Sequence, residues 1–222
     1  MRISFALIDR LPYLMVSFRK EDRNYERTFY CFWRGKRCWK VNDNKKIYDR
    51  LCFEGREIVL TKEPSNTKMG LLSREIANEI AGKSLACLVA SDRFYHVENI
   101  ILPEINKGKI VLSDRNILSA FVFNKMDGIS FEYTERLYEG ITYPKVIILL
   151  YASPQIVYER LKKRDELTRY EKVRIGYEQE VINESVRYLR KRNIEIYEVS
   201  TEVSEIETTK RVYDIINQYS KL

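Results

Sequence analysis

Charged and hydroxyl side chains follow three short apolar runs of this sequence, and their types suit the binding of phosphate. The segments are Leu60–Thr67 (LTKEPSNT), Leu112–Asn124 (LSDRNILSAFVFN) and Leu149–Glu171 (LLYASPQIVYERLKKRDELTRYE). Arginine recurs in the second and third segments, and its guanidinium group binds phosphate through paired N–H donors without losing its charge. These segments are therefore the first places to look for a binding or catalytic site.

The same charged residues also have plainer explanations. The run Lys162–Arg164 could be a solvated face of a helix, because most surface charges contribute little to stability or function. The pair Asp114–Arg115, which follows an apolar run, could be a helix cap with a surface partner. Both explanations stay open when the residues are considered one at a time.

The elements that must position these residues follow a regular alternation. Four β-branched runs predict strands at Glu57–Thr61, Lys109–Ser113, Val146–Tyr151 and Ile194–Val199. Helical patterns lie between and after them, at Leu71–Ala81, Leu85–Asn106, Pro154–Lys163, Tyr170–Arg192 and Ser204–Tyr219. This order predicts a three-layer, doubly wound α/β domain with a parallel sheet covered on both faces. Ligands of such folds bind at the carboxyl ends of the strands, where the three segments begin.

Composition limits the other classes of function. Residues 1–50 contain 13 basic and 6 acidic side chains, and the rest of the chain contains 26 of each, so the whole net charge of +7 lies in the head. A nucleic-acid-binding head is one interpretation, but the neutral body argues against a nucleic-acid partner. Cys31, Cys38, Cys52 and Cys87 form no disulfide-dense pattern, which favours a reducing cytoplasm. No apolar run is long enough for a membrane span.

Four motifs in order resemble those of the thymidylate kinases, which are nucleoside monophosphate kinases of the P-loop NTPase class. The family's T-R-E-P-G-G-T, L-F-A-x-D-R, D-R-Y-x-x-S-x-x-A-Y-Q and R-L-x-x-R-x-x-x-D-R-F-E appear at Thr61–Thr67, Leu88–Arg93, Asp114–Asn124 and Arg160–Glu171. The resemblance covers about residues 47–222, with a lid at about 158–172. Residues 1–46 form an atypical N-terminal segment.

The resemblance implies a role for each matching residue. Arg93 and Arg115 would hold the acceptor monophosphate, and Asp114 would assist Mg²⁺ or orient the acceptor. The substrate would also meet Glu63, Pro64, Ser119 and Asn124. The triphosphate would be covered by the lid arginines Arg160, Arg164 and Arg169. His96, which matches the histidine of the family's D-R-x-x-H-V, is interpreted as structural.

The resemblance further implies transfer of the γ-phosphoryl group of ATP to dTMP, as a step of dTTP synthesis, by a cytoplasmic homodimer without membrane or nucleic-acid partners. The alternative is a catalytically inactive paralogue that binds nucleotide weakly or serves as a dimerisation partner. Three departures leave the preferred base open. Val89 replaces a phenylalanine that stacks on thymine, Thr168 replaces a lid aspartate, and Asn124 is shorter than the family's glutamine.

The largest departure is a missing phosphate loop. No G-x-x-x-x-G-K-[ST] precedes the first motif, where Trp33–Lys40 reads WRGKRCWK. A reading shifted one nucleotide downstream must turn Trp39 into glycine, because TGG followed by AA contains GGA. It also permits F-I-V-F-G-G-E-R-G-V-G-K-S-T-I-I-K across residues 29–45. A frameshift near Lys45–Ile47 is therefore our hypothesis. It predicts that residues 1–44 pack poorly, with the first strand missing from the centre of the sheet.

Overall fold

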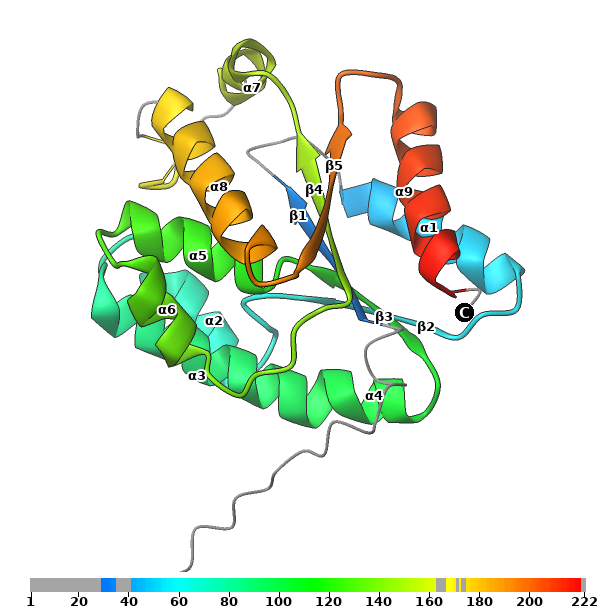
Figure 1. Cartoon of the computed structure of the whole chain (residues 1–222), viewed down its shortest axis with the longest axis horizontal. Helices are drawn as coiled ribbons and strands as arrows, with labels where there is room; N and C mark the ends of the chain where they lie inside the picture. Colours follow the sequence, from blue (N-terminus) through cyan, green and yellow to red (C-terminus); the bar gives the residue numbers. More distant parts are fainter. Residues whose placement is uncertain (1–28, 35–40, 163–166, 171, 173–174, 221–222) are drawn as a thin grey trace, which may run out of the picture.

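The fold is a three-layer α/β sandwich, seen in a computed structural model that describes residues 29–34, 41–162, 167–170, 172 and 175–220 (Figure 1). Its parallel sheet has five strands in the order β2-β3-β1-β4-β5. The strands are β1 (Phe29–Arg34), β2 (Ile58–Lys62), β3 (Ile110–Asp114), β4 (Val146–Tyr151) and β5 (Glu195–Ser200). The predicted doubly wound α/β class is confirmed. The four predicted strands lie within one residue of their observed positions.

Strand β1 occupies the centre of the sheet, and the prediction of a missing first strand is wrong. It pairs with β3 from Phe29 to Phe32 and with β4 from Tyr30 to Arg34. Residues 29–32 are at most 2 % exposed, so the expected poor packing is also wrong for them. The physical reason is that an unbroken apolar run is what a strand covered on both faces requires. Residues 1–28 and 35–40 lie outside the described part of the chain.

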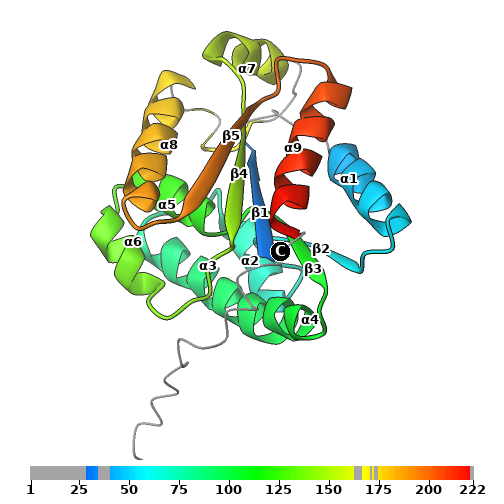
Figure 2. The ribbon, with the colours of Figure 1, turned by 45° about the vertical axis from the view of Figure 1, so that its right-hand side comes forward.

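Helices cover both faces of the sheet (Figures 1 and 2). On one face, Tyr30 and Phe32 pack with residues of α1 and α9. On the other, Phe29 and Cys31 pack with residues of α3, α5 and α8. The helical elements are α1 (Val41–Phe53), α2 (Lys68–Ile76), α3 (Lys83–His96), the π-helix η2 (Val97–Ile101), α4 (Leu102–Asn106), α5 (Ile117–Met126), α6 (Phe131–Leu137), α7 (Pro154–Leu161), α8 (Ile175–Arg190) and α9 (Glu205–Ser220).

Three of these helices, α1, α5 and α6, are absent from the predicted set. Helix α5 is almost uniformly apolar and is buried on most of its surface, so it lacks the amphipathic period that marks a surface helix. The predicted helix at Leu85–Asn106 is observed as α3, η2 and α4 in succession. Pro103 lies at the start of α4 and has no N–H to donate, which fits a local change of hydrogen-bond register. Within the described residues, no helix combines the length and apolarity needed to cross a bilayer.

Candidate functional site

The candidate site lies where the carboxyl ends of β1, β2 and β3 meet. Asp114 at the end of β3 is level with Lys62 of β2 and with Phe32 of β1. The Glu63 amide donates to the Asp114 carbonyl oxygen at 2.9 Å, and the Arg115 amide donates to the Phe32 carbonyl oxygen at 2.6 Å. The sheet therefore joins the segments that follow β2 and β3, as expected for the ligand-binding edge of a parallel sheet.

The Glu63 carboxylate is the centre of a buried hydrogen-bond network. Its Oε2 accepts from Nε of Arg93 at 2.5 Å. Its Oε1 lies 3.1 Å from Nδ1 of His96 and accepts from Nδ2 of Asn116 at 3.0 Å. Nε2 of His96 in turn lies 2.6 Å from the Thr61 hydroxyl. We call Thr61, Glu63, Arg93, His96 and Asn116 the Glu63 network. It links β2, α3 and the turn after β3.

Arg93 is buried as a cation beside Glu63, with only 3 % of its side chain exposed. Burial by itself would lower the pKa of the guanidinium group, but the charge of Glu63, its hydrogen bond to Arg93 and the nearby Tyr138 and Cys31 together outweigh burial, and the net pKa is above the usual value. The group also lies over the Tyr138 ring, 4.8 Å from its centre. Its Nη1 is buried and has no hydrogen-bond partner among the described residues. Because a buried donor normally needs an acceptor, this nitrogen suits an anionic or carbonyl ligand.

Cys31 lies on β1 close to the same charges. Burial raises the pKa of its thiol well above the ordinary value of 9.0, and the negative charges of Glu63 and Asp114 raise it further. The side chain therefore stays a neutral thiol at physiological pH. Because the thiolate is the reactive form of cysteine, Cys31 is a packing residue of the site and not a nucleophile.

The loop between β2 and α2 is held by two further side chains. The buried Asp92 carboxylate accepts from the Ser65 amide and from the hydroxyls of Ser65 and Thr67, each at 2.6 Å. Arg74 donates to the carbonyl oxygens of Pro64 and Ser65. Gly70 is required beneath the loop, because a Cβ there would lie 2.2 Å from the Ser65 carbonyl oxygen. The loop that carries Glu63 and Pro64 is thus fixed at several points.

Arg115 has an unusual backbone conformation at the end of β3. Its φ is +72°, in the left-handed region that non-glycine residues rarely adopt. The Ser113 hydroxyl donates to the Arg115 carbonyl oxygen at 2.7 Å. The Arg115 guanidinium group lies over the Phe123 ring, 5.4 Å from the ring centre. Such strain is most often tolerated where it aims a side chain at a ligand.

The other two predicted acceptor residues lie on α5. Ser119 is buried, and its hydroxyl oxygen has no hydrogen-bond partner in the described part of the chain. Asn124 is also buried, but its amide nitrogen donates to the Thr134 hydroxyl of α6 at 3.2 Å. Ser119 is therefore available to a ligand, whereas Asn124 has a structural partner.

The lid arginines lie in different places. Arg160 donates to the Thr201 hydroxyl at 3.3 Å and to its carbonyl oxygen at 3.1 Å, beside the turn after β5. Arg169 makes two hydrogen bonds, of 2.6 and 2.8 Å, to the carboxylate of Asp127, which follows α5. Arg164 and residues 35–40, where a phosphate loop between β1 and α1 would lie, are outside the described residues.

Several contributors to the site were not assigned a role from the sequence. Asp92 and Asn116 belong to the matched motifs but carried no individual prediction, and His96 was interpreted as structural. One signal for His96 was available. Residues three apart lie on the same face of a helix, so the spacing of Arg93 and His96 places both toward Glu63.

Comparison with known proteins identifies a family for this chain. Residues 40–215 match the family model described as thymidylate kinase. The chain is 31 % identical over 142 residues to a probable thymidylate kinase of Pyrococcus abyssi, covering 60 % of this chain and 69 % of that protein. It is 28 % identical over 179 residues to a thymidylate kinase of Caldicellulosiruptor saccharolyticus, covering 76 % and 87 %. The chain belongs to the thymidylate kinase family.

Proposed function

We propose that this protein transfers the γ-phosphoryl group of ATP to dTMP. The observation that carries the proposal is the junction of the motifs after β2 and β3, where Glu63 holds the buried Arg93 beside the strained turn at Arg115. Family membership supports the same reaction. Phosphoryl transfer needs little covalent participation by the protein, so two positioned arginines and a donor-phosphate site are the main requirements.

In the acceptor site, Arg93 and Arg115 would bind the monophosphate, while Ser119 and Pro64 would lie along the nucleoside. The open Nη1 of Arg93 and the open hydroxyl of Ser119 support this assignment. Glu63 already accepts from three donors, so its part is to orient Arg93 and not to take a proton from the substrate.

Mg²⁺ would be held by Asp114. This carboxylate lies at the carboxyl end of β3, beside the ends of β1 and β2, and supplies the oxygen ligand that Mg²⁺ prefers. The described residues contain no cluster of three or more typical ligating side chains. That fits Mg²⁺, which usually takes one or two carboxylates together with substrate phosphates and water. The ion would neutralise charge on the transferred group.

The donor site would be built from the β1–α1 connection and the lid. Arg160 and Arg164 would approach the triphosphate. For Arg169 we propose a docking role in place of the expected triphosphate contact, because its guanidinium group is bound to Asp127 and also donates to the Ala77 carbonyl oxygen at 2.6 Å.

The second candidate, an inactive paralogue, is favoured by one observation, the absence of a phosphate-loop sequence before the helix that begins at Val41. We also propose a cytoplasmic location, in keeping with the free cysteines Cys31, Cys52 and Cys87. From the family resemblance we propose a homodimer, which sedimentation analysis would test.

The test of the acceptor site is the binding of dTMP, measured by calorimetry, because it needs neither ATP nor turnover. Replacing Arg115 with alanine should weaken binding by about 1.5–3 kcal/mol, the range for hydrogen bonds to a charged group. Arg211→Ala is the matched control, since it removes the same charge from an exposed ion pair on α9. Equal dTMP affinity in the wild type and Arg115→Ala would refute the assignment.

A further inference from the structure

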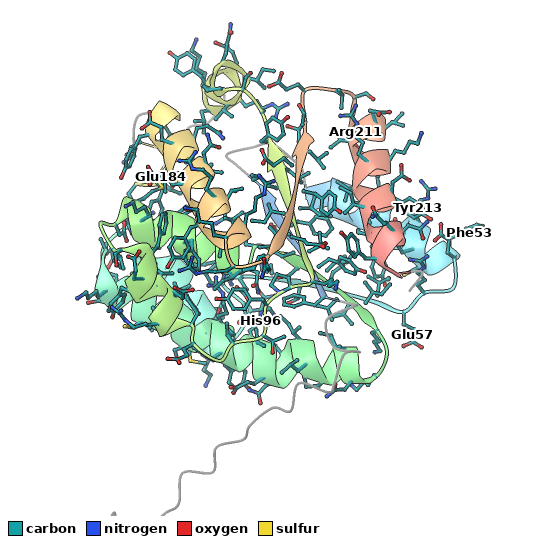
Figure 3. All side chains as sticks on the ribbon, in the orientation of Figure 1. Phe53, Glu57, His96, Glu184, Arg211 and Tyr213 are labelled. Atoms are coloured by element: carbon teal, nitrogen blue, oxygen red, sulfur yellow. The ribbon has the colours of Figure 1, made fainter. Side chains whose placement is uncertain are left out.

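His96 is fully buried and has a hydrogen-bond partner at each ring nitrogen. Nε2 lies 2.6 Å from the Thr61 hydroxyl, and Nδ1 lies 3.1 Å from Oε1 of Glu63. The ring is 0 % exposed, and Figure 3 shows it in the interior of the molecule. Thr61 and Glu63 both lie at the end of β2, so the His96 ring, which belongs to α3, contacts two residues of that strand end.

The chemistry of the partners determines which nitrogen carries the proton. An ionised carboxylate can only accept hydrogen bonds, so Nδ1 must be the donor to Glu63. A ring protonated at Nδ1 alone accepts at Nε2, and the Thr61 hydroxyl would then be its donor. Asn116 is oriented by the same logic. Its Oδ1 accepts from the Ile117 amide at 2.6 Å, which leaves its amide nitrogen to donate to Glu63.

These contacts fix the rotation of the Glu63 carboxylate. His96 and Asn116 both donate to Oε1, so Oε2 is left to face Nε of Arg93. Arg93 is thereby held through one edge of its guanidinium group, while Nη1 has no hydrogen-bond partner in the described residues. A carboxylate free to rotate would compete for that nitrogen and reduce its availability to a ligand.

We propose that His96 is a positioning residue for the nucleotide acceptor, acting through Glu63 on Arg93, with Thr61 selecting its tautomer. The proposal rests on the proposed function, in which Arg93 binds the acceptor nucleotide. It assigns a role to a residue that touches neither the nucleotide nor the transferred phosphoryl group. Any buried histidine needs partners at its ring nitrogens; the distinguishing feature here is that the partner at Nδ1 is the carboxylate that orients Arg93.

Two substitutions separate this role from a merely structural one. The amide nitrogen of asparagine can occupy the place of Nδ1, so His96→Asn keeps a donor to Glu63. The amide group of glutamine reaches the place of Nε2, so His96→Gln keeps the contact with Thr61 and loses the one with Glu63. Both variants should lose thermal stability, but dTMP affinity should stay within about threefold for His96→Asn and fall by about tenfold or more for His96→Gln. Equal dTMP affinity of the two variants would overturn the proposal.

A nitrogen NMR spectrum of the untagged wild-type protein tests the relay, the hydrogen-bond chain from Thr61 through His96 to Glu63, without any substitution. The chain has one histidine, so the signal is unambiguous. In the wild type we expect a single form of the ring, protonated at Nδ1. In Thr61→Val, which keeps the side-chain shape and removes the hydroxyl donor, we expect a mixture of the two tautomers. A wild-type ring protonated at Nε2 would contradict the proposal. If the Nδ1 tautomer is present but the wild type does not bind dTMP, the proposed acceptor function fails and the relay stands as a structural device only.

Discussion

The buried charges of the site are balanced within a few residues. Glu63 and Arg93 are both nearly inaccessible to water, and each compensates the cost of burying the other. His96 and Asn116 satisfy the remaining lone pairs of the carboxylate. Removing one member of such a group leaves an uncompensated charge, which is why single substitutions here should affect stability as well as binding.

Cys31 gives a pH prediction at the residue scale. Its folded pKa is raised, first by burial and then by Glu63 and Asp114. Above the ordinary pKa of 9.0 the unfolded thiol loses its proton while the folded thiol keeps it, so the free energy of unfolding should fall as the pH rises. Urea unfolding from about pH 8 to about pH 10 should show a steeper fall for the wild type than for Cys31→Ala. The exposed Cys87→Ala is the control and should follow the wild type.

Among the elements, β1 occupies the centre of the sheet. It lies between β3 and β4, and Phe29 and Phe32 project into the two opposite cores. A central strand of this kind positions both neighbours, so the turn at Asp114–Arg115 depends on it directly through the Phe32 carbonyl oxygen.

The stability of β1 can be measured with one substitution. Phe29→Ala should lower the free energy of unfolding by about 3–5 kcal/mol, because it leaves a cavity in a fully buried position. Phe53→Ala, at the exposed end of α1 and 93 % exposed, should change it by less than about 0.5 kcal/mol (Figure 3). Similar small effects of both substitutions in chemical denaturation would indicate that Phe29–Arg34 does not form the central strand.

The segment Leu167–Tyr170 is anchored to α5 through Asp127. This carboxylate accepts two hydrogen bonds from Arg169, one from the Tyr170 hydroxyl at 3.2 Å and one from the Gly82 amide at 3.1 Å. The centres of the Tyr170 and Phe123 rings are 4.6 Å apart. The Arg115 guanidinium group also lies over the Phe123 ring. The end of the lid motif is thus packed against the proposed acceptor side of the domain.

Asp127→Asn should loosen this anchor while leaving the sheet intact. We expect a loss of about 1–2 kcal/mol in unfolding free energy, discounted because the Arg169 side chain is one quarter exposed. Limited proteolysis should cut near residues 167–170 faster than in the wild type. Glu159→Gln, which removes an exposed ion pair with Lys162, is the control. It should change neither the unfolding free energy nor the rate of proteolysis. Unchanged proteolysis of Asp127→Asn would mean that the carboxylate does not hold the segment.

At the scale of the whole molecule, the proposed acceptor site is built around the Glu63 network, while the sequence of the proposed donor site departs from a phosphate loop. The chain passes from β1 to α1 through residues 35–40, where a phosphate loop would place backbone N–H groups at the start of a helix. The written residues 35–42 contain a single glycine, Gly35, and lack the G-K-[ST] that ends that pattern. The frameshift hypothesis predicted that no buried strand would lie here, so the paired and buried β1 counts heavily against it, although Phe29 and Phe32 are permitted by both the written and the shifted reading.

Activity assays separate the two readings. The chain as written should have kinase activity with ATP and Mg²⁺ that is at least about 100-fold below that of a chain with a complete phosphate loop, because loss of even one preorganised donor costs on the order of 100-fold in rate. A chain read one nucleotide downstream over residues 29–45 should phosphorylate dTMP, and dUMP, dGMP and dAMP should be assayed beside it because of Val89. Sequencing the DNA across Lys45–Ile47 is the direct check. If the shifted chain folds but transfers phosphate to none of the four, the inactive paralogue becomes the better description.

The sequence by itself determined the alternation of elements and the motif residues. Strand positions at Val146–Tyr151 and near Ile58–Lys62 follow from β-branched apolar runs, whose side chains favour the extended backbone of a sheet. Arg93, Asp114 and Arg115 were identified from motif spacing. These features are local, so they can be read from neighbouring residues.

Only the tertiary structure decided which of those residues act together. The partnership of Glu63 with Arg93, His96 and Asn116 joins positions up to 53 residues apart, and no local pattern encodes such a contact. The central place of β1 and the pairing of Arg169 with Asp127 were hidden for the same reason. A buried ion pair or a central strand is stabilised by what surrounds it in space. Its surroundings exist only after β2, β3 and α3 have packed against one another.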